Sequence, residues 1–152
     1  MKHKSVCIEP ASAADLPALV DLLSVLFTQE AEFTPDRQAQ YRGLSHIISH
    51  AALGVVLVAR GGSEVLGMVS LLYSVSTALG ARVAWLEDWV VQPSARGTGV
   101  GSQLLQAAIA HARAEGCQRI TLLTDSDNHA AQRMYQAQGF TQSSMVPMRL
   151  SL

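Results

Sequence analysis

The stretch Arg96-Gly97-Thr98-Gly99-Val100-Gly101-Ser102 contains three glycines in seven residues. An apolar run before it predicts a strand over 82–91, and helical spacing after it predicts a helix over 99–115. Glycine permits positive φ angles and lets a ligand approach the backbone without a Cβ in the way. The free N–H groups and the dipole of the following helix favour an anion. The stretch therefore predicts a diphosphate-binding loop, with a plain connecting turn as the alternative.

Apolar periodicity on either side of this loop predicts a single α+β domain, a mixed α/β sandwich over residues 1–152. The patterns indicate helices over 12–27, 41–48, 99–115 and 128–138, the first opened by a Ser12–Asp15 capping box. They indicate strands over 6–10, 54–60, 65–75, 82–91 and 120–123, then extended chain from Phe140 with a last strand over 145–150. No repeat or linker divides the chain.

Composition excludes several classes of protein. The chain has 152 residues, 49% of them hydrophobic, and a net charge of -1, so it carries no electrostatic footprint for nucleic acid. Cys7 and Cys117 are expected to be reduced thiols. The first ten residues lack the apolar segment of a signal peptide, and the most apolar stretch, 51–59, is too short to span a bilayer. We expect a soluble cytoplasmic domain with no nucleic-acid or membrane partner.

A dinucleotide-binding loop is the main competing interpretation of the glycines. Gly97 and Gly99 could open a G-x-G-x-x-G fingerprint, and Asp125 could bind a ribose. However, Ser102 stands where the third glycine belongs, and the linker 92–96 is long for so tight a turn. A P-loop is excluded because no lysine follows the glycines.

Two motifs together resemble the GCN5-related N-acetyltransferase (GNAT) superfamily. The first is R-x-x-G-x-G, filled by Arg96, Gly99 and Gly101. The second is Asn128-x-x-Ala131-x-x-x-Tyr135-x-x-x-Gly139-Phe140, in which Asn128 is a good helix N-cap. The resemblance extends over nearly the whole chain. It implies the family's mixed, mostly antiparallel sheet of six to seven strands flanked by about four helices, with acetyl-CoA as cosubstrate.

The resemblance also implies how the chain binds acetyl-CoA. The diphosphate would lie on Arg96, Gly97, Thr98, Gly99, Val100, Gly101 and Ser102, the pantetheine arm on the backbone of Trp89, Val90 and Val91, and the donor's remainder beside Asn128, Ala131 and Tyr135. Tyr135 would protonate the departing thiolate, which is chemically reasonable because a phenol has a pKa of about 10 and a thiol about 8.5. The alternative for Tyr135 is a core aromatic with a satisfied hydroxyl.

Two adjacent carboxylates interrupt the apolar strand Trp85-Leu86-Glu87-Asp88-Trp89. Burying charge there is costly, and a carboxylate can take the proton of an acceptor amine, which is mostly an ammonium at neutral pH. Alternation puts Glu87 and Asp88 on opposite faces unless the strand bulges. The stretch looks like that of the diamine acetyltransferase branch, which favours Glu87 as the residue that meets the amine, with Asp88 second. The alternative is a salt-bridged or capping carboxylate.

The end of the first helix and its loop would wall the acceptor pocket by the same resemblance. They supply Glu30, Glu32, Phe33 and Asp36, whose acids could attract a cationic amine or simply form a solvated helix end. His46 and His50 share a helical face without a further ligand, so we expect no metal.

The expected activity is direct transfer of acetyl from acetyl-CoA to a primary amine of a small, possibly cationic substrate, without an acetyl-enzyme. A non-catalytic coenzyme-A sensor on the same fold is the alternative. Polyamine, amino acid, aminoglycoside and protein amines all stay open as acceptors. A homodimer is usual among similar proteins.

Overall fold

A five-stranded mixed sheet forms the centre of the molecule. The computed structural model describes residues 5–30 and 32–152. The strand order is β1-β2-β3-β4-β5, for β1 (Val6–Pro10), β2 (Gly54–Gly61), β3 (Glu64–Ser76), β4 (Ala81–Val91) and β5 (Ile120–Thr121). The first four strands pair antiparallel, and β5 runs parallel to β4. The sheet is thus mixed and mostly antiparallel, as the family resemblance implied.

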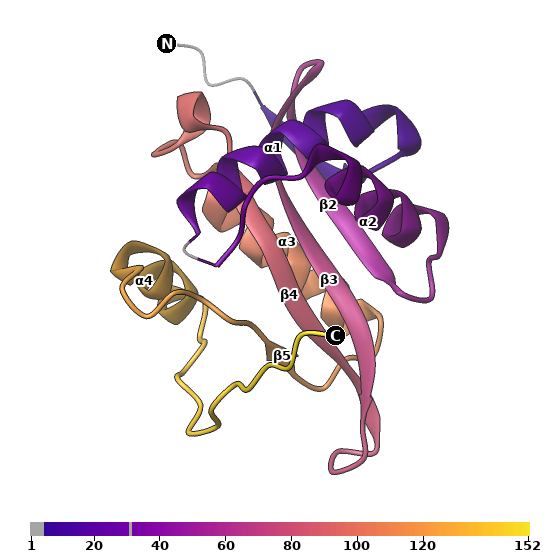
Figure 1. Cartoon of the computed structure of the whole chain (residues 1–152), viewed down its shortest axis with the longest axis vertical. Coiled ribbons are helices and arrows are strands. Elements are labelled where there is room, and N and C mark those ends of the chain that lie inside the picture. Colours follow the sequence, from indigo (N-terminus) through magenta and orange to yellow (C-terminus); the bar gives the residue numbers. More distant parts are fainter. Residues whose placement is uncertain (1–4, 31) are drawn as a thin grey trace.

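Helices cover both faces of this sheet. Helices α1 (Leu16–Gln29) and α2 (Arg37–Ser49) lie over one face and α3 (Val100–Ala114) over the other (Figure 1). Helix α4 (His129–Ala137) lies beyond β4, on the side opposite β2. Short 3-10 turns, Ala13–Asp15 and Pro93–Ala95, precede α1 and α3. The four predicted helices are confirmed.

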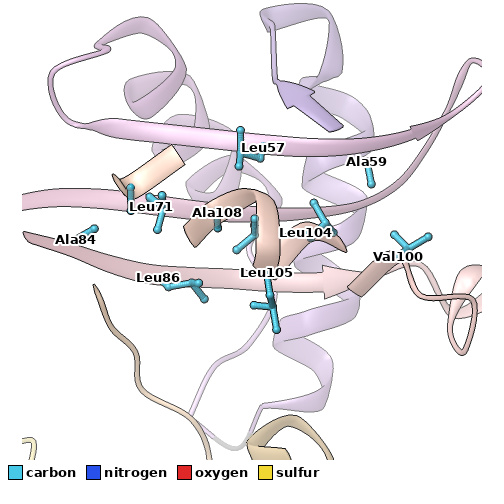
Figure 2. Packing of buried hydrophobic residues seen from close by; sticks show 11 residues of the cluster. Leu57, Ala59, Leu71, Ala84, Leu86, Val100, Leu104, Leu105 and Ala108 are labelled. Atoms are coloured by element: carbon cyan, nitrogen blue, oxygen red, sulfur yellow. The ribbon is translucent and has the colours of Figure 1, made fainter. Parts of the chain in front are cut away.

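The core has two layers, one on each side of the sheet. On the α3 side, Leu104, Leu105 and Ala108 are fully buried against strand residues such as Leu57 and Leu71 (Figure 2). On the other side, leucines of α1 and α2 pack on β2 and β3 around Val58 and Met68. Full burial of one such side chain contributes about 1.5–3 kcal/mol, so these layers fix how the sheet and helices meet.

A β-bulge interrupts the pairing of β3 with β4. Met68 pairs with Val90, but Ser70 pairs with Glu87, so two residues of β4 oppose one of β3. Leu86 consequently packs on the α3 side while Val90 packs on the α1 side, although regular alternation would put both on one face. The bulge therefore reverses which side chains point where in the last part of β4.

The predicted count of six to seven strands is wrong, because the described residues form five. The last predicted strand, 145–150, has no regular secondary structure and lies outside the sheet. Pro147 lies in its middle and cannot donate to a strand ladder, and Met145, Met148 and Leu150 are at least 82% exposed. The apolar residues of 145–150 thus predict a strand where none forms.

No membrane-crossing element is found in the part of the chain that the structure describes, since none of its helices has the required length and hydropathy.

Candidate active site

A cleft of about 1580 Å³ opens where β4 and β5 separate. The two strands pair at Ala84–Ile120 and Trp85–Thr121, and on this side of β4 no strand of the described residues lies beside the part beyond Trp85. The cleft is lined from six places: the end of α1 and its loop, β4, the loop before α3, the segment after β5, α4, and the chain near the carboxyl terminus.

Most of the predicted site residues meet in this cleft. Those that line it are Glu30, Glu32, Phe33, Glu87, Asp88, Trp89, Val90, Val91, Arg96, Gly97, Gly99, Gly101, Ser102, Asn128, Ala131 and Tyr135. Thr98 and Val100 do not line it. The Thr98 hydroxyl donates to the carbonyl of Ala95, and the Val100 side chain is buried in the core.

The glycine loop presents backbone N–H groups to the cleft. Gly97 and Gly99 have φ angles of 75° and 90°, in the left-handed region that other residues rarely adopt. Gly99 is the N-cap of α3 and has no side chain to accept from the first turn, so the N–H groups of 100–102 have no intrahelical partner. These donors, together with the helix dipole, fit an anionic group such as a diphosphate.

Three aromatic rings connect this loop to α4. The Trp89 ring centroid lies 5.2 Å from that of Tyr135, which lies 5.9 Å from that of Phe140. The side-chain amide of Gln138 also donates to the Ser102 hydroxyl at 3.3 Å, joining α4 to α3. Burial, with a smaller effect from the charge of Glu30, raises the pKa of Tyr135 to about 12. The phenol is therefore protonated throughout the neutral range and can act as a proton donor.

The bulge brings both strand carboxylates to the same cleft. Asp88 has a φ of 53°, and both Glu87 and Asp88 line the cavity instead of facing opposite sides of the sheet. Loss of hydration, and then the nearby charges of Glu87 and Glu30, raise the pKa of Asp88 to about 7. Glu87 is exposed. Both carboxylates therefore line the cleft, where the sequence left open which of the two does.

The predicted acids of the first loop have different surroundings. Glu30 is half-buried, and loss of hydration followed by the charges of Asp125, Glu32 and Glu87 raises its pKa. Glu32 forms an ion pair with Arg149. Asp36 instead caps α2, accepting from the Ala39 N–H at 3.1 Å, which is the helix-end interpretation.

Sequence reasoning missed several lining residues. Met134 and Leu123 carry no signal beyond apolarity, and Arg149 comes from a segment expected to pair in the sheet. The sequence predicts for Asp125 only the role of a ribose ligand. Its position just after β5, beside the edge at which β4 and β5 separate, is the signal that would have found it.

The histidine pair lies outside the cleft. The rings of His46 and His50 are 4.6 Å apart, and His46 lines a separate shallow hollow with residues of α2 and β3. Within residues 5–30 and 32–152, no group of three or more metal-ligating side chains occurs.

The dinucleotide interpretation does not agree with the topology. A dinucleotide fold needs a doubly wound parallel sheet, whereas here β5 runs parallel to β4 but β1, β2, β3 and β4 all pair antiparallel.

Comparisons with known proteins identify a family. Residues 16–140 match the acetyltransferase (GNAT) family. An uncharacterised N-acetyltransferase, YhfO, of Bacillus subtilis is 30% identical over 90% of this chain and 91% of its own. A type 1 aminoglycoside N(6')-acetyltransferase of Klebsiella aerogenes is 36% identical over 68% of each chain. An aminoalkylphosphonate N-acetyltransferase of Salmonella typhimurium is 30% identical over 91% of this chain and 87% of its own.

Solved structures share the fold. An integron cassette protein from a salt-marsh metagenome superposes with a TM-score of 0.83 at 26% identity, covering 95% of this chain and 90% of its own. An acetyltransferase assigned by prediction in Clostridium acetobutylicum, solved with acetyl-CoA, gives 0.76 at 15% identity, covering 97% and 96%.

Proposed function

The chain belongs to the acetyltransferase (GNAT) family, and from this premise we propose that it transfers acetyl from acetyl-CoA to a primary amine of a small molecule. Enzymes of the family use acetyl-CoA. The observation that carries the proposal is one cleft in which an anion-binding loop, a protonated phenol and two carboxylates meet. Relatives whose names specify aminoglycosides and aminoalkylphosphonates support an amine of a small molecule as the acceptor class.

The residues present fit the donor. N–H groups at the start of α3 would hold the diphosphate, with Asn128 and Ala131 of the α4 start beside it. The unpaired edge of β4 at Trp89, Val90 and Val91 offers backbone groups to an extended arm, as a sheet edge does to an added strand. Acetyl-CoA supplies an acyl group on a good leaving thiolate.

We propose that Asp88 takes the proton of the amine, with Glu87 as its partner in binding the ammonium. This reverses the order favoured from the sequence, because Asp88 is less exposed than Glu87 and its pKa of about 7 suits proton transfer at neutral pH. Glu87, more exposed, stays a candidate for attracting the cation.

The amine nitrogen then bonds to the acyl carbon while the carbon–sulfur bond breaks. A backbone N–H near Val90 would stabilise the carbonyl oxygen, and Tyr135 would donate its proton to the sulfur. The first proton of the ammonium thus goes to Asp88, and the second proton, which the nitrogen loses as the amide forms, goes to solvent, from which the phenolate is protonated again. Neither Cys7 nor Cys117 lines the cleft, which supports direct transfer over an acetyl-enzyme.

Release of free coenzyme-A thiol tests the proposal. Incubation with acetyl-CoA and a panel of amines should release thiol with at least one amine class. The wild-type protein should also bind acetyl-CoA when no amine is present. Failure to bind acetyl-CoA, or binding without release for every amine class, would contradict the proposal. The latter result is also what a coenzyme-A sensor would give.

A further inference from the structure

Ser70, in the middle of β3, carries a buried hydroxyl without a hydrogen-bond partner in the part of the chain that the structure describes. The residue is 0% exposed. It pairs with Val56 across β2 and β3, and Met68 and Leu72 lie two positions away on its own strand. These neighbours are apolar, so an alanine would fit the position without leaving a polar atom unpaired. The serine hydroxyl therefore requires an explanation.

The neighbour of Ser70 on β4 is Glu87. The two residues are paired across β3 and β4, immediately next to the bulge. Side chains of directly opposed residues in an antiparallel pair point to the same face of the sheet, with Cβ atoms about 4.5–5.5 Å apart. This face is the one that α1 covers, because Val56 and Met68 pack in the α1 layer. The unpaired hydroxyl thus lies beside the start of the Glu87 side chain.

Glu87 extends from this buried pair into the cleft. It is exposed and lines the cavity, and its carboxylate takes part in no ion pair among residues 5–30 and 32–152. A carboxylate accepts hydrogen bonds at both oxygens, so one oxygen can accept from Ser70 while the other meets a cation. A long side chain with several rotatable bonds populates many rotamers unless a contact selects one. A hydroxyl at its base is such a contact.

Resting on the acetyl transfer proposed above, we infer that Ser70 is a positioning residue for the acceptor amine. Its hydroxyl donates to the Glu87 carboxylate when the ammonium is bound, and so holds that carboxylate toward the amine. The bound amine excludes water from the carboxylate, and a hydrogen bond to a charged group is stronger in such surroundings. Ser70 acts only through Glu87, because it is fully covered and does not line the cleft.

Ser70→Ala tests this inference. The probe is the amine of the panel described above that the wild-type protein acetylates fastest. We expect the KM for this amine to rise about tenfold, because the lost hydrogen bond is one to a charged group, while kcat changes by less than about twofold. The affinity for acetyl-CoA should stay the same. The Tm should not fall, because the hydroxyl has no partner before the amine binds.

Ser45→Ala is the matched control. The Ser45 hydroxyl on α2 is also buried without a partner among the described residues, but Ser45 lies outside the cleft. Its replacement should leave the KM for the amine unchanged.

Two further comparisons separate the hydroxyl from packing. Thr and Val have nearly the same shape, so Ser70→Thr and Ser70→Val crowd the core alike and differ in the hydroxyl. The KM of the Thr variant should be about tenfold lower than that of the Val variant. In a Glu87→Ala background, Ser70→Ala should change kcat/KM by less than about twofold, because the acceptor of the hydrogen bond is gone.

The possible failures are distinguishable. An unchanged KM in Ser70→Ala, a loss confined to kcat, or an effect that persists in full in the Glu87→Ala background overturns the positioning role and leaves acetyl transfer intact. A lower Tm or loss of the fold in Ser70→Ala also overturns it, because the hydroxyl would then serve the fold itself. Absence of thiol release by the wild-type protein with amines of every class overturns the proposed function.

Discussion

The indole N–H of Trp89 donates a hydrogen bond of 3.0 Å to the carbonyl of Gly101. The same ring lies against the space in which a side chain at Gly101 would begin, because a Cβ there would be 3.0 Å from Trp89 Cζ2. Trp89 in turn packs on the ring of Tyr135. The missing side chain of one glycine therefore sets the position of the proposed proton donor.

Gly101→Ala should impair activity more than stability. The added methyl group would also lie 3.4 Å from Val91 Cγ2, so the Trp89 indole must move. This movement changes the contact of the indole with the Tyr135 ring. Alanine meanwhile favours the helix by about 0.5–1 kcal/mol, which offsets the clash. We expect kcat/KM to fall roughly tenfold, a fall of about 1.4 kcal/mol in transition-state stabilisation, with Tm changed by no more than about 3 °C.

Gly43→Ala is the matched control, because a Cβ at Gly43 of α2 meets nothing within 4 Å. It should raise stability by up to about 1 kcal/mol and leave turnover as in the wild type. Equal activity of both alanine variants would show that the Trp89 position does not matter for turnover.

Tyr135→Phe should lower kcat while acetyl-CoA still binds. The ring contacts with Trp89 and Phe140 persist, but the proton donor is gone, and a positioned acid typically contributes about 10²–10⁴-fold. Rapid-mixing kinetics and equilibrium titration with acetyl-CoA separate the two effects.

Tyr73→Phe controls for the loss of a hydroxyl as such. Tyr73 lies outside the cleft and contacts His111 Nε2 at 3.0 Å through its hydroxyl. The Tyr73→Phe protein should lose about 1 kcal/mol in free energy of unfolding and keep full activity. Wild-type kcat in Tyr135→Phe would remove the phenol from the mechanism.

The sequence predicted those parts of the site that depend on local chemistry. Asn128 caps α4 by accepting from the Ala131 N–H at 3.2 Å, and the loop glycines adopt the left-handed angles for which glycine is needed. Both follow from a residue and its near neighbours. The contact of the Trp89 ring with the Tyr135 ring was not predicted, because it joins segments 46 positions apart in the sequence.

The bulge in β4 could not be predicted from alternation alone. Strand periodicity places Glu87 and Asp88 on opposite faces of the sheet. The register that brings both to one cleft depends on how β3 and β4 pair between the two core layers. The prediction of a strand after Phe140 was wrong for a related reason. Alternating apolar residues in this segment resemble a strand, but pairing also needs a neighbouring strand edge, and Pro147 cannot donate a hydrogen bond to one.

The pH dependence of kcat/KM should report Asp88. With the pKa of Asp88 at about 7, kcat/KM should rise through neutral pH as the carboxylate forms, and it should level off before the amine, whose pKa is about 10.4, loses its own proton. The charges facing Asp88 are Glu87 on the same strand and Glu30 after α1. A bound ammonium would offset them, so the inflection in kcat should lie below that in kcat/KM.

Asp88→Asn should remove the inflection near pH 7 and lower activity by about 10²–10⁴-fold. The profile of Glu87→Gln distinguishes the two carboxylates. If Glu87→Gln abolished the inflection and Asp88→Asn preserved it, Glu87 would be the base, as the resemblance first suggested.

The same substitution should stabilise the protein, and more at high pH. Asp88 has a pKa of about 7 in the fold, against an ordinary value of 3.8, so between these pH values the folded state binds more protons than the unfolded chain. Stability therefore falls as pH rises from about 4 to about 7, by on the order of 3–4 kcal/mol. Asn carries no charge and tolerates the left-handed φ of 53° as well as Asp does.

Thermal unfolding at two pH values measures this directly. At pH 8, Asp88→Asn should raise Tm by about 5–10 °C, and at pH 5 the difference should be at most half as large. The exposed Glu64→Gln should leave Tm unchanged at both pH values. An Asp88→Asn protein less stable than the wild type at pH 8 would mean that the carboxylate is satisfied in the fold. In that case Asp88 would already have a partner in the folded protein, and its raised pKa would no longer support its assignment as the base.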